Sequence, residues 1–314
     1  MVKIVLLGAG NHSQGNHLPA LTLYAAEHPD EVELAGLCDL RAEHARAMAA
    51  RYGFARVYTD LDEMLEKEQP DGCVAITPIP ATREIALRII RAGVPLLMEK
   101  PPGATVAEAR EIVEVAEQTR ARVMVSMNRR FDPGLRRALD WTAGRPPVKY
   151  VRGTIIRHRR TEATFVEGTA IHPLDVLRKI AGDVRAFETD FWEVEGIRWF
   201  VVRLQFEGGA KGVLEVLPTA GCVREFYEMC GPGYRVVVHT VSGGPGRVQC
   251  WEGGEKVVDE EPLKGMPDFI RNGAYGETVE FISALQEDRA PHPSPAEVLQ
   301  TVELCHAIAG TGGG

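Results

Sequence analysis

The pattern of apolar and polar positions divides the chain into two parts with different periodicity. Over about the first 125 residues, short apolar runs alternate with stretches that repeat at helical spacing, which is typical of parallel strands joined by crossover helices. The expected strands are Val2–Leu7, Val32–Cys38, Gly72–Ile76, Pro95–Met98 and Arg122–Met127. The first part is therefore predicted to be a doubly wound α/β domain.

Local signals mark the ends of the helices between these strands. Thr105 and Glu108 form an S/T-x-x-E capping box ahead of a helical apolar repeat. Gly93 follows a helical stretch through Ile85–Ala92 and supplies the left-handed residue at which a helix commonly stops.

After about Asn128 the pattern changes to several β-rich stretches. They are Val148–Arg157, Phe187–Val194, Trp199–Phe206, Ala210–Leu217 and Arg235–His239. A hairpin-type turn, Glu207-Gly208-Gly209, joins two of them, so a large and mainly antiparallel sheet is expected. A last helix is predicted to begin at Ser294-Pro295-Ala296-Glu297. We expect an α/β domain over residues 1–125 and an α+β domain over residues 126–314, with the last helix packing back on the first domain.

Composition narrows the class of protein. A chain of 314 residues has the length of two domains, and its net charge of −8 argues against a nucleic-acid partner. Six scattered cysteines without a C-x-x-C pair are typical of reduced thiols. The apolar run at the N-terminus is too short for a signal peptide or a membrane span. We expect a cytoplasmic protein without a membrane or nucleic-acid partner.

A glycine-rich turn follows the first strand. Its residues are Gly8-Ala9-Gly10-Asn11-His12-Ser13. In a Rossmann dinucleotide-binding domain, Gly8 would permit the tight turn, Gly10 would let the backbone approach the pyrophosphate, and small Ser13 would replace the third glycine. The alternative is an ordinary strand-to-helix turn.

Asp39 ends the second strand, where a carboxylate can accept both hydroxyls of the adenosine ribose. It lies further from Gly8 than is usual, so the first helix or its loop must contain an insertion. An acidic residue here favours NAD over NADP, although Arg41 would partly offset the repulsion of a 2′-phosphate. The alternative role of Asp39 is a helix N-cap.

Two further segments follow strands. Thr77-Pro78-Ile79-Pro80 comes after one strand and Glu99-Lys100-Pro101-Pro102 after the next. Ligands of doubly wound sheets bind at the carboxyl ends of the strands, so both segments are expected to face the cofactor. A surface lysine at the start of a loop is the alternative for Lys100.

These motifs together resemble the Gfo/Idh/MocA family, whose type members are glucose-fructose oxidoreductase and inositol dehydrogenase. The resemblance rests on the glycine turn, Cys38-Asp39, Thr77-Pro78-x-Pro80, Glu99-Lys100-Pro101, Arg129-Arg130-Phe131 and Ile171-His172-Pro173-Leu174-Asp175. It implies a Rossmann domain, an α/β domain with a large antiparallel sheet, and a homodimer or homotetramer. It also implies a dehydrogenase that acts on a hydroxyl carbon of a sugar, cyclitol or related polyol.

The same resemblance assigns roles to particular residues. Lys100 is expected to touch the reacting oxygen and help to move its proton, and His172 to be its acid/base partner. Asp175, one helical turn on, would orient the imidazole or contact the substrate. The predicted cofactor contacts are Gly8, Gly10, Asn11, His12, Ser13, Asp39, Arg41, Thr77, Pro78, Glu99, Lys100 and Asn128. Without a third ligand in sequence, no metal site is expected at His172 and Asp175.

The chain departs from the family pattern at two positions. Gly168 stands where many members have an aspartate four residues before the histidine, and Thr82 replaces a frequent histidine. A helix that started at Pro173 would leave Gly168 in the preceding loop, where Glu167 could substitute for the missing carboxylate.

Arg157, His158, Arg159 and Arg160 lie at the end of the strand before this segment. Arg157 is predicted to contact the substrate, and paired guanidiniums would hold a carboxylate or phosphate. The alternative is a solvated basic strand end. Two other functions stay open at this point: an NAD-dependent glycosidase or lyase that regenerates its cofactor in place, and a nucleotide-binding regulator without turnover.

Overall fold

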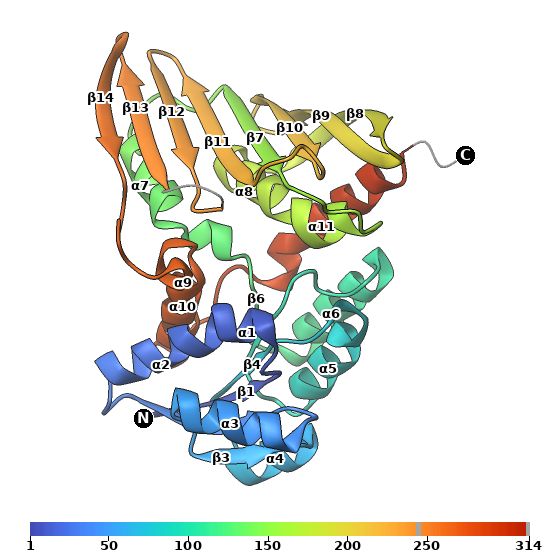
Figure 1. Ribbon diagram of the computed structural model, residues 1–314, viewed down its shortest axis with the longest axis vertical. Coiled ribbons are helices and arrows are strands. Elements are labelled where there is room, and N and C mark those ends of the chain that lie inside the picture. The colour runs from blue at the N-terminus through green and yellow to red at the C-terminus, as the bar shows by residue number, and fades with distance from the viewer. Residues whose placement is uncertain (243–245, 312–314) are drawn as a thin grey trace. The chain divides into compact units, whose positions relative to one another are not determined.

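The computed structural model describes residues 1–242 and 246–311, which form two compact units (Figure 1). The first unit contains residues 1–126 and 274–299, and the second contains residues 127–273 and 300–314. Among the described residues, no helix is both long and apolar enough to cross a membrane.

The first unit is built on a six-stranded parallel sheet with the order β3-β2-β1-β4-β5-β6. Its strands are β1 (Val2–Leu7), β2 (Val32–Cys38), β3 (Arg56–Tyr58), β4 (Gly72–Ala75), β5 (Leu96–Met98) and β6 (Val123–Val125). The order reverses between β1 and β4, which places a crevice at the carboxyl ends of these strands. The predicted doubly wound fold is confirmed, and only the short strand β3 was missed.

Helices connect these strands. They are α1 (Asn11–Gly15), α2 (His17–Glu27), α3 (Ala42–Tyr52), α4 (Leu61–Glu68), α5 (Ile79–Arg91), α6 (Val106–Thr119) and, from the later segment, α10 (Ala274–Gln286). The predicted cap is confirmed for Thr105, whose hydroxyl accepts from the amide of Glu108, whereas the Glu108 carboxylate accepts from the amide of Ala104 instead of that of Thr105. Gly93 has the expected left-handed backbone, with φ +75°. The two helices α1 and α2 account for the long spacing between Gly8 and Asp39.

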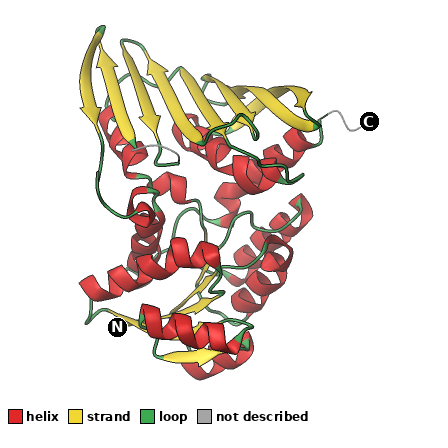
Figure 2. Cartoon of the chain, in the orientation of Figure 1, coloured by secondary structure: helices red, strands yellow, loops and turns green. Residues whose placement is uncertain are grey.

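The second unit contains an eight-stranded sheet with the order β14-β13-β12-β11-β7-β10-β9-β8, and Figure 2 shows helices along one of its faces. The strands are β7 (Tyr150–Ile156), β8 (Val184–Val194), β9 (Ile197–Phe206), β10 (Lys211–Leu217), β11 (Arg224–Gly231), β12 (Tyr234–His239), β13 (Arg247–Glu252) and β14 (Glu255–Glu260). All neighbours are antiparallel except β7 and β10. The mainly antiparallel sheet and the β9–β10 hairpin are confirmed.

Side chains of alternating burial fix the register of this sheet. On β9, Phe200, Val202, Leu204 and Phe206 are each at most 4% exposed, whereas Arg203 between them is exposed. One face thus packs against helices and the other carries polar and charged residues. The helical elements of this unit are η1 (Asn128–Phe131), α7 (Pro133–Thr142), η2 (Val166–Ala170), α8 (Ile171–Ala181), α9 (Asp268–Arg271) and most of α11 (Pro295–Ala309). The predicted Ser294 cap of α11 is confirmed, since the hydroxyl accepts from the amide of Glu297.

Candidate functional site

The glycine turn after β1 requires glycine for a steric reason. Gly8 has φ +91°, and a Cβ atom there would lie 2.1 Å from the carbonyl oxygen of Ile76. By contrast, no atom lies within 4 Å of a Cβ built on Gly10, so the space beside that backbone is open. The turn therefore packs closely against the residue after β4 on one side and leaves room for a ligand on the other.

A cavity of about 590 Å³ opens at this turn, and every residue that lines it belongs to the first unit. The sequence-predicted residues in its wall are Gly8, Gly10, Asn11, His12, Ser13, Asp39, Arg41, Thr77 and Pro78. Apolar side chains that the sequence analysis did not single out complete the wall, namely Leu7, Leu40, Ile76, Ala81 and Ile85. Most of the predicted cofactor residues thus converge on one cavity.

Asp39 is fixed at the edge of the cavity by hydrogen bonds. Its Oδ2 accepts from the amide of Ala9 at 3.1 Å, and its Oδ1 accepts from the amide and the Nε of Arg41 at 3.0 and 3.1 Å. Burial acts to raise the pKa of this carboxyl, but the hydrogen bonds from Arg41 and Ala9 outweigh it and lower the pKa. Asp39 is therefore a carboxylate that joins the end of β2 to the glycine turn. It does not act as a side-chain cap of α3.

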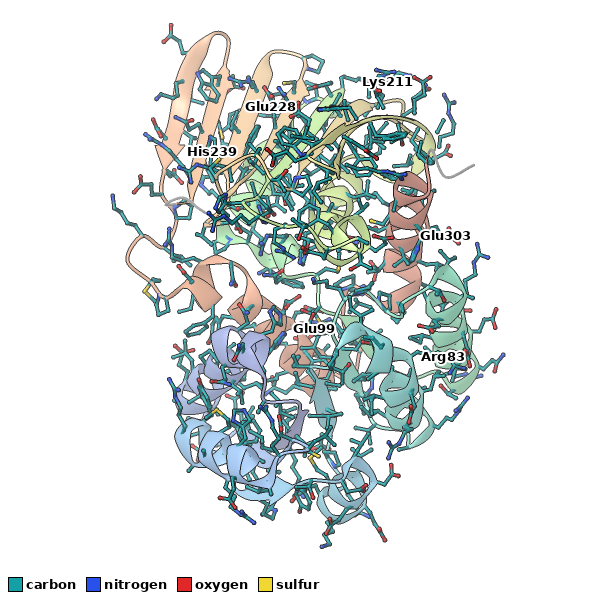
Figure 3. All side chains as sticks on the ribbon, turned by 45° about the vertical axis from the view of Figure 1, so that its right-hand side comes forward. Arg83, Glu99, Lys211, Glu228, His239 and Glu303 are labelled. Atoms are coloured by element: carbon teal, nitrogen blue, oxygen red, sulfur yellow. The ribbon has the colours of Figure 1, made fainter. Side chains whose placement is uncertain are left out.

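Glu99, labelled in Figure 3, follows β5 and is buried. Its Oε1 lies 3.0 Å from Nε2 of both His12 and His17, and its Oε2 accepts from the amide of Lys100 at 3.2 Å. Burial acts to raise its pKa, yet the two imidazoles hold the pKa well below the usual range. His17 was not predicted as a site residue, although it follows His12 by five residues and begins the second helix, α2.

Lys100 follows Glu99 directly and is partly exposed. Its backbone is held by the carboxylate of Glu99, so its position depends on the same cluster as His12. The structure therefore places Lys100 directly after the carboxyl end of β5, in agreement with the predicted strand end.

His172 lies in the second unit, near the start of α8, and is 9% exposed. The helical segment begins earlier than a start at Pro173 would allow, because Gly168 lies within the π-helical turn η2 that runs directly into α8. Pro173 has no amide hydrogen to donate to the preceding turn of the helix. The wider π-helical turn η2 just before it allows the helix to continue through this residue. Gly168 is therefore not in a loop.

The carboxylate of Glu167 lies inside the second unit. Its Oε2 is buried and has no hydrogen-bond partner among the described residues. Burial raises the pKa of the Cys305 thiol, and the charges of Glu167 and Asp175 raise it further, which places both carboxylates near α11.

Asp175 is held by an arginine of the Arg129-Arg130-Phe131 segment. Nε and Nη2 of Arg130 donate to its two oxygens, each at 2.7 Å, and the Thr301 hydroxyl lies 3.4 Å from Oδ1. The carboxylate predicted to orient His172 is thus itself oriented by a bidentate ion pair.

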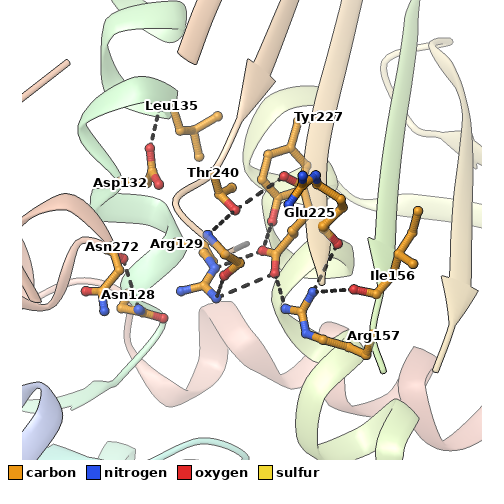
Figure 4. Close-up of polar contacts among 12 residues, drawn as sticks. Asn128, Arg129, Asp132, Leu135, Ile156, Arg157, Glu225, Tyr227, Thr240 and Asn272 are labelled. Carbon is orange, nitrogen blue, oxygen red and sulfur yellow. Dashed lines mark hydrogen bonds and ion pairs between the residues drawn. The ribbon is translucent and has the colours of Figure 1, made fainter. Parts of the chain in front are cut away.

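Arg157 also lies in a buried polar cluster, drawn in Figure 4. Its guanidinium binds the carboxylate of Glu225, which also accepts from Nε of Arg129 at 2.8 Å and from the Tyr227 hydroxyl at 2.7 Å. Burial acts to raise the pKa of Glu225, but the charges of the two arginines, with a contribution from His172, hold it far below the usual range. Arg157 is therefore not a solvated strand end. The charge of Asp132 also acts on Arg129, so two guanidiniums and two carboxyl groups lie in this region of the second unit.

Asn128, a predicted cofactor contact, begins η1 in the second unit. Its side-chain amide donates to the carbonyl of Asn272 at 2.9 Å, as Figure 4 shows. Asn128 thus does not line the cavity described above.

Comparisons with known proteins agree with this architecture. Residues 2–127 match the Gfo/Idh/MocA family model, described as an oxidoreductase family with an NAD-binding Rossmann fold. The chain is 30% identical over 204 residues to D-apiose dehydrogenase of Paraburkholderia graminis, which covers 58% of this chain and 50% of that relative. It is 29% identical over 201 residues to inositol 2-dehydrogenase of Rhizobium meliloti, covering 58% and 56% of the two chains. The chain thus spans about half the length of these relatives.

One relative matches along almost the whole chain. It is 4-carboxy-2-hydroxymuconate-6-semialdehyde dehydrogenase of Sphingobium sp., 25% identical over 327 residues, with 98% of this chain and 97% of that protein covered. Among solved structures, a Gfo/Idh/MocA family oxidoreductase from Vibrio cholerae has a TM-score of 0.84 at 20% identity, covering 98% of this chain and 97% of the other. At that identity the structural likeness concerns the fold.

Proposed function

Because the chain belongs to the Gfo/Idh/MocA family of NAD-binding oxidoreductases, we propose that it is an NAD-dependent dehydrogenase acting on a hydroxyl carbon of a sugar, cyclitol or related polyol. The observation that supports this most directly is the cavity formed by the glycine turn, Asp39 and Thr77. The names of the relatives, which include a sugar dehydrogenase and an inositol dehydrogenase, support the substrate class.

The residues of the cavity fit a dinucleotide. The open space beside Gly10 suits a pyrophosphate close to the backbone, and ribose hydroxyls could donate to the Asp39 carboxylate in place of the half-exposed Arg41 side chain. Leu40, Ile76 and Ile85 offer apolar surface to an adenine ring. When bound, NAD supplies the hydride acceptor.

We propose NAD rather than NADP because Asp39 is a carboxylate and repels a 2′-phosphate. Arg41 opposes this preference, but its Nε and amide already bind Asp39. This pairing directs the guanidinium toward Asp39, so we propose that Arg41 does not bind a 2′-phosphate.

Two side chains are proposed to act on the reacting hydroxyl. An alcohol that loses hydride must also lose a proton, and His172 is proposed to accept it. The ammonium of Lys100 is proposed to stabilise the negative charge that develops on the oxygen. Asp175 is proposed to support His172 from the next turn of α8, where Arg130 keeps the carboxylate in one orientation.

Arg157 is proposed to influence the substrate by charge. The guanidinium of Arg157, beside Glu225 and Arg129, would attract an acidic group on the substrate. The relative that matches along the whole chain is named for a carboxylated substrate.

A homodimer or homotetramer is proposed to form through the face of the eight-stranded sheet that does not pack on helices. Trp192 on β8 is 41% exposed and lies beside Trp199 on β9, with ring centroids 6.2 Å apart. Such aromatic residues are enriched at interfaces between proteins.

The experiment is to incubate the full chain with NAD and a panel of sugars, cyclitols and sugar acids, and to follow NADH by its absorbance. Net NADH formation with at least one compound is expected. Consumption of a glycoside without net NADH would favour the glycosidase or lyase alternative. Tight NAD binding without turnover on any compound would favour a regulator.

A further inference from the structure

Three side chains of the first unit converge on a single oxygen atom. Nε2 of His12 on α1 and Nε2 of His17 on α2 each lie 3.0 Å from Oε1 of Glu99, which follows β5. The three potential ligand atoms all lie within 4.8 Å of one another. Two imidazoles and one carboxylate are a ligand set of catalytic zinc sites. We propose that His12, His17 and Glu99 bind a divalent first-row transition metal such as Zn²⁺.

The carboxylate is arranged to bind through one oxygen. Oε2 of Glu99 accepts from the Lys100 amide at 3.2 Å, and this bond orients the carboxylate so that Oε1 faces both imidazoles. A partner of this kind on the second oxygen is a common way of fixing a ligating carboxylate.

The two nitrogen–oxygen distances require only a small adjustment. With Zn–N and Zn–O bonds of about 2.0–2.2 Å, tetrahedral ligand atoms lie roughly 3.4 Å apart. Each imidazole nitrogen therefore has to move outward by roughly half an ångström from its position on Glu99. The His12 side chain is 55% exposed and would have to bring its nitrogen closer to that of His17, since the ligand atoms are known only to lie within 4.8 Å of one another. The buried side chains of His17 and Glu99 hold the other two positions.

The fourth ligand position lies on the open side of the cluster. His12 is the exposed member and lines the 590 Å³ cavity, so a water molecule or a ligand in the cavity can complete the coordination. Three protein ligands with one open position are typical of a catalytic zinc site rather than a structural one.

The surroundings of the imidazoles set the expected strength of binding. An imidazole that ligates through Nε2 carries its proton on Nδ1, which needs an acceptor. Nδ1 of His12 lies 3.4 Å from Nδ2 of Asn16, which also donates to the His12 carbonyl, so solvent would be the acceptor for this nitrogen on the exposed His12 ring. Nδ1 of His17 is buried and has no hydrogen-bond partner among the described residues. One missing acceptor weakens a site by about 10–100-fold, so we expect micromolar affinity.

The test is calorimetric titration of Zn²⁺ alone into the full chain after treatment with a chelator, without NAD or substrate. A Cys222→Ser background removes the exposed thiol as a competing ligand. One ion per chain is expected. His12→Ala and Glu99→Gln should each weaken binding by at least about tenfold. Co²⁺ in place of Zn²⁺ should give the absorption spectrum of a tetrahedral site.

His44→Ala is the matched control. His44 also packs on the glycine turn, with Nε2 2.8 Å from the carbonyl of Ala9, but it lies outside the triad, so its loss should leave Zn²⁺ affinity unchanged. If Glu99→Gln fails to fold, His12→Ala is the decisive variant, because the side chain of His12 is exposed. Absence of Zn²⁺ binding, or equal affinity in His12→Ala and His44→Ala, would overturn the proposal and leave a purely hydrogen-bonded cluster. Because the readout is metal binding alone, failure here would not bear on the dehydrogenase assignment.

Discussion

Arg130 holds both carboxylate oxygens of Asp175 at 2.7 Å, with only 11% and 1% of the two side chains exposed. This ion pair joins the 3-10 helix η1 to α8, three residues after His172. Removing one partner leaves a buried charge without compensation. Arg130→Ala should therefore lower the free energy of unfolding by about 3–5 kcal/mol in urea denaturation.

The control for this prediction is an exposed ion pair on the sheet. Arg203 and Glu188 are 62% and 69% exposed, so Arg203→Ala should change stability by less than about 1 kcal/mol. Equal effects of the two substitutions would show that burial does not determine the strength of the Arg130 pair.

Lys100→Ala should lower turnover by about a hundredfold or more while leaving NAD affinity nearly intact. The reason is that the proposed role of the ammonium concerns charge on the reacting oxygen. Steady-state rates, together with NADH titration by fluorescence, separate the two quantities. Near-normal turnover would remove Lys100 from the mechanism.

Cofactor preference depends on the Asp39 carboxylate. NADH is expected to bind at least about tenfold more tightly than NADPH, because juxtaposed like charges are costly. Asp39→Asn keeps an acceptor for the Ala9 amide but removes the negative charge. This variant should therefore have a smaller difference in affinity between NADH and NADPH. A wild-type preference for NADPH would mean that Arg41 determines the choice.

The missing aspartate at Gly168 leaves two candidates for proton transfer near α8. His172→Ala, Glu167→Ala and Gly168→Asp should be compared on a substrate found in the panel. We expect a loss of about a hundredfold or more in His172→Ala and a small effect in Glu167→Ala, because the family resemblance assigns proton transfer to His172 and Oε2 of Glu167 is buried. An equal loss at Glu167 would identify it as the replacement carboxylate. Full activity of His172→Ala would exclude this segment from catalysis.

Asp132 should make stability depend on pH in mildly acidic solution. Burial raises its pKa from 3.8 to about 6, against the opposing effect of amide hydrogen bonds from Leu135 and Gly134. The folded state therefore binds this proton more tightly than the unfolded state. The resulting stabilisation is complete below about pH 4 and is lost as the pH rises toward 6.

Urea unfolding of the wild type and Asp132→Asn between pH 4 and 7 measures this effect. The asparagine keeps an oxygen for the cap of α7 but cannot ionise. Relative to the variant, the wild type should lose about 3 kcal/mol across the window, from 1.36 kcal/mol per pKa unit. If the free energy of unfolding changed with pH in the same way in the wild type and in Asp132→Asn, the raised pKa of Asp132 would be contradicted.

The sequence by itself determined the elements and the cofactor cavity to a large extent. Local signals suffice there: the period of apolar residues sets the strands, the Thr105 box sets a helix start, and a turn as tight as that at Gly8 excludes any Cβ. Residues that follow parallel strands in a doubly wound sheet must meet at one edge, so Gly8, Asp39 and Thr77 could be grouped from their order alone. Strands such as Arg224–Gly231 and Glu255–Glu260 were missed because alternating charged residues weaken the apolar pattern.

Only the tertiary structure decided which charges pair. Glu225 joins Arg129 and Arg157 across 96 and 68 residues, and Glu99 joins His17 across 82. The grouping of residues 274–299 with the first unit likewise depends on contacts between segments far apart in sequence. Such pairings follow from the exclusion of water when elements pack, since a buried charge must find a partner wherever the chain supplies one. No local pattern encodes that choice.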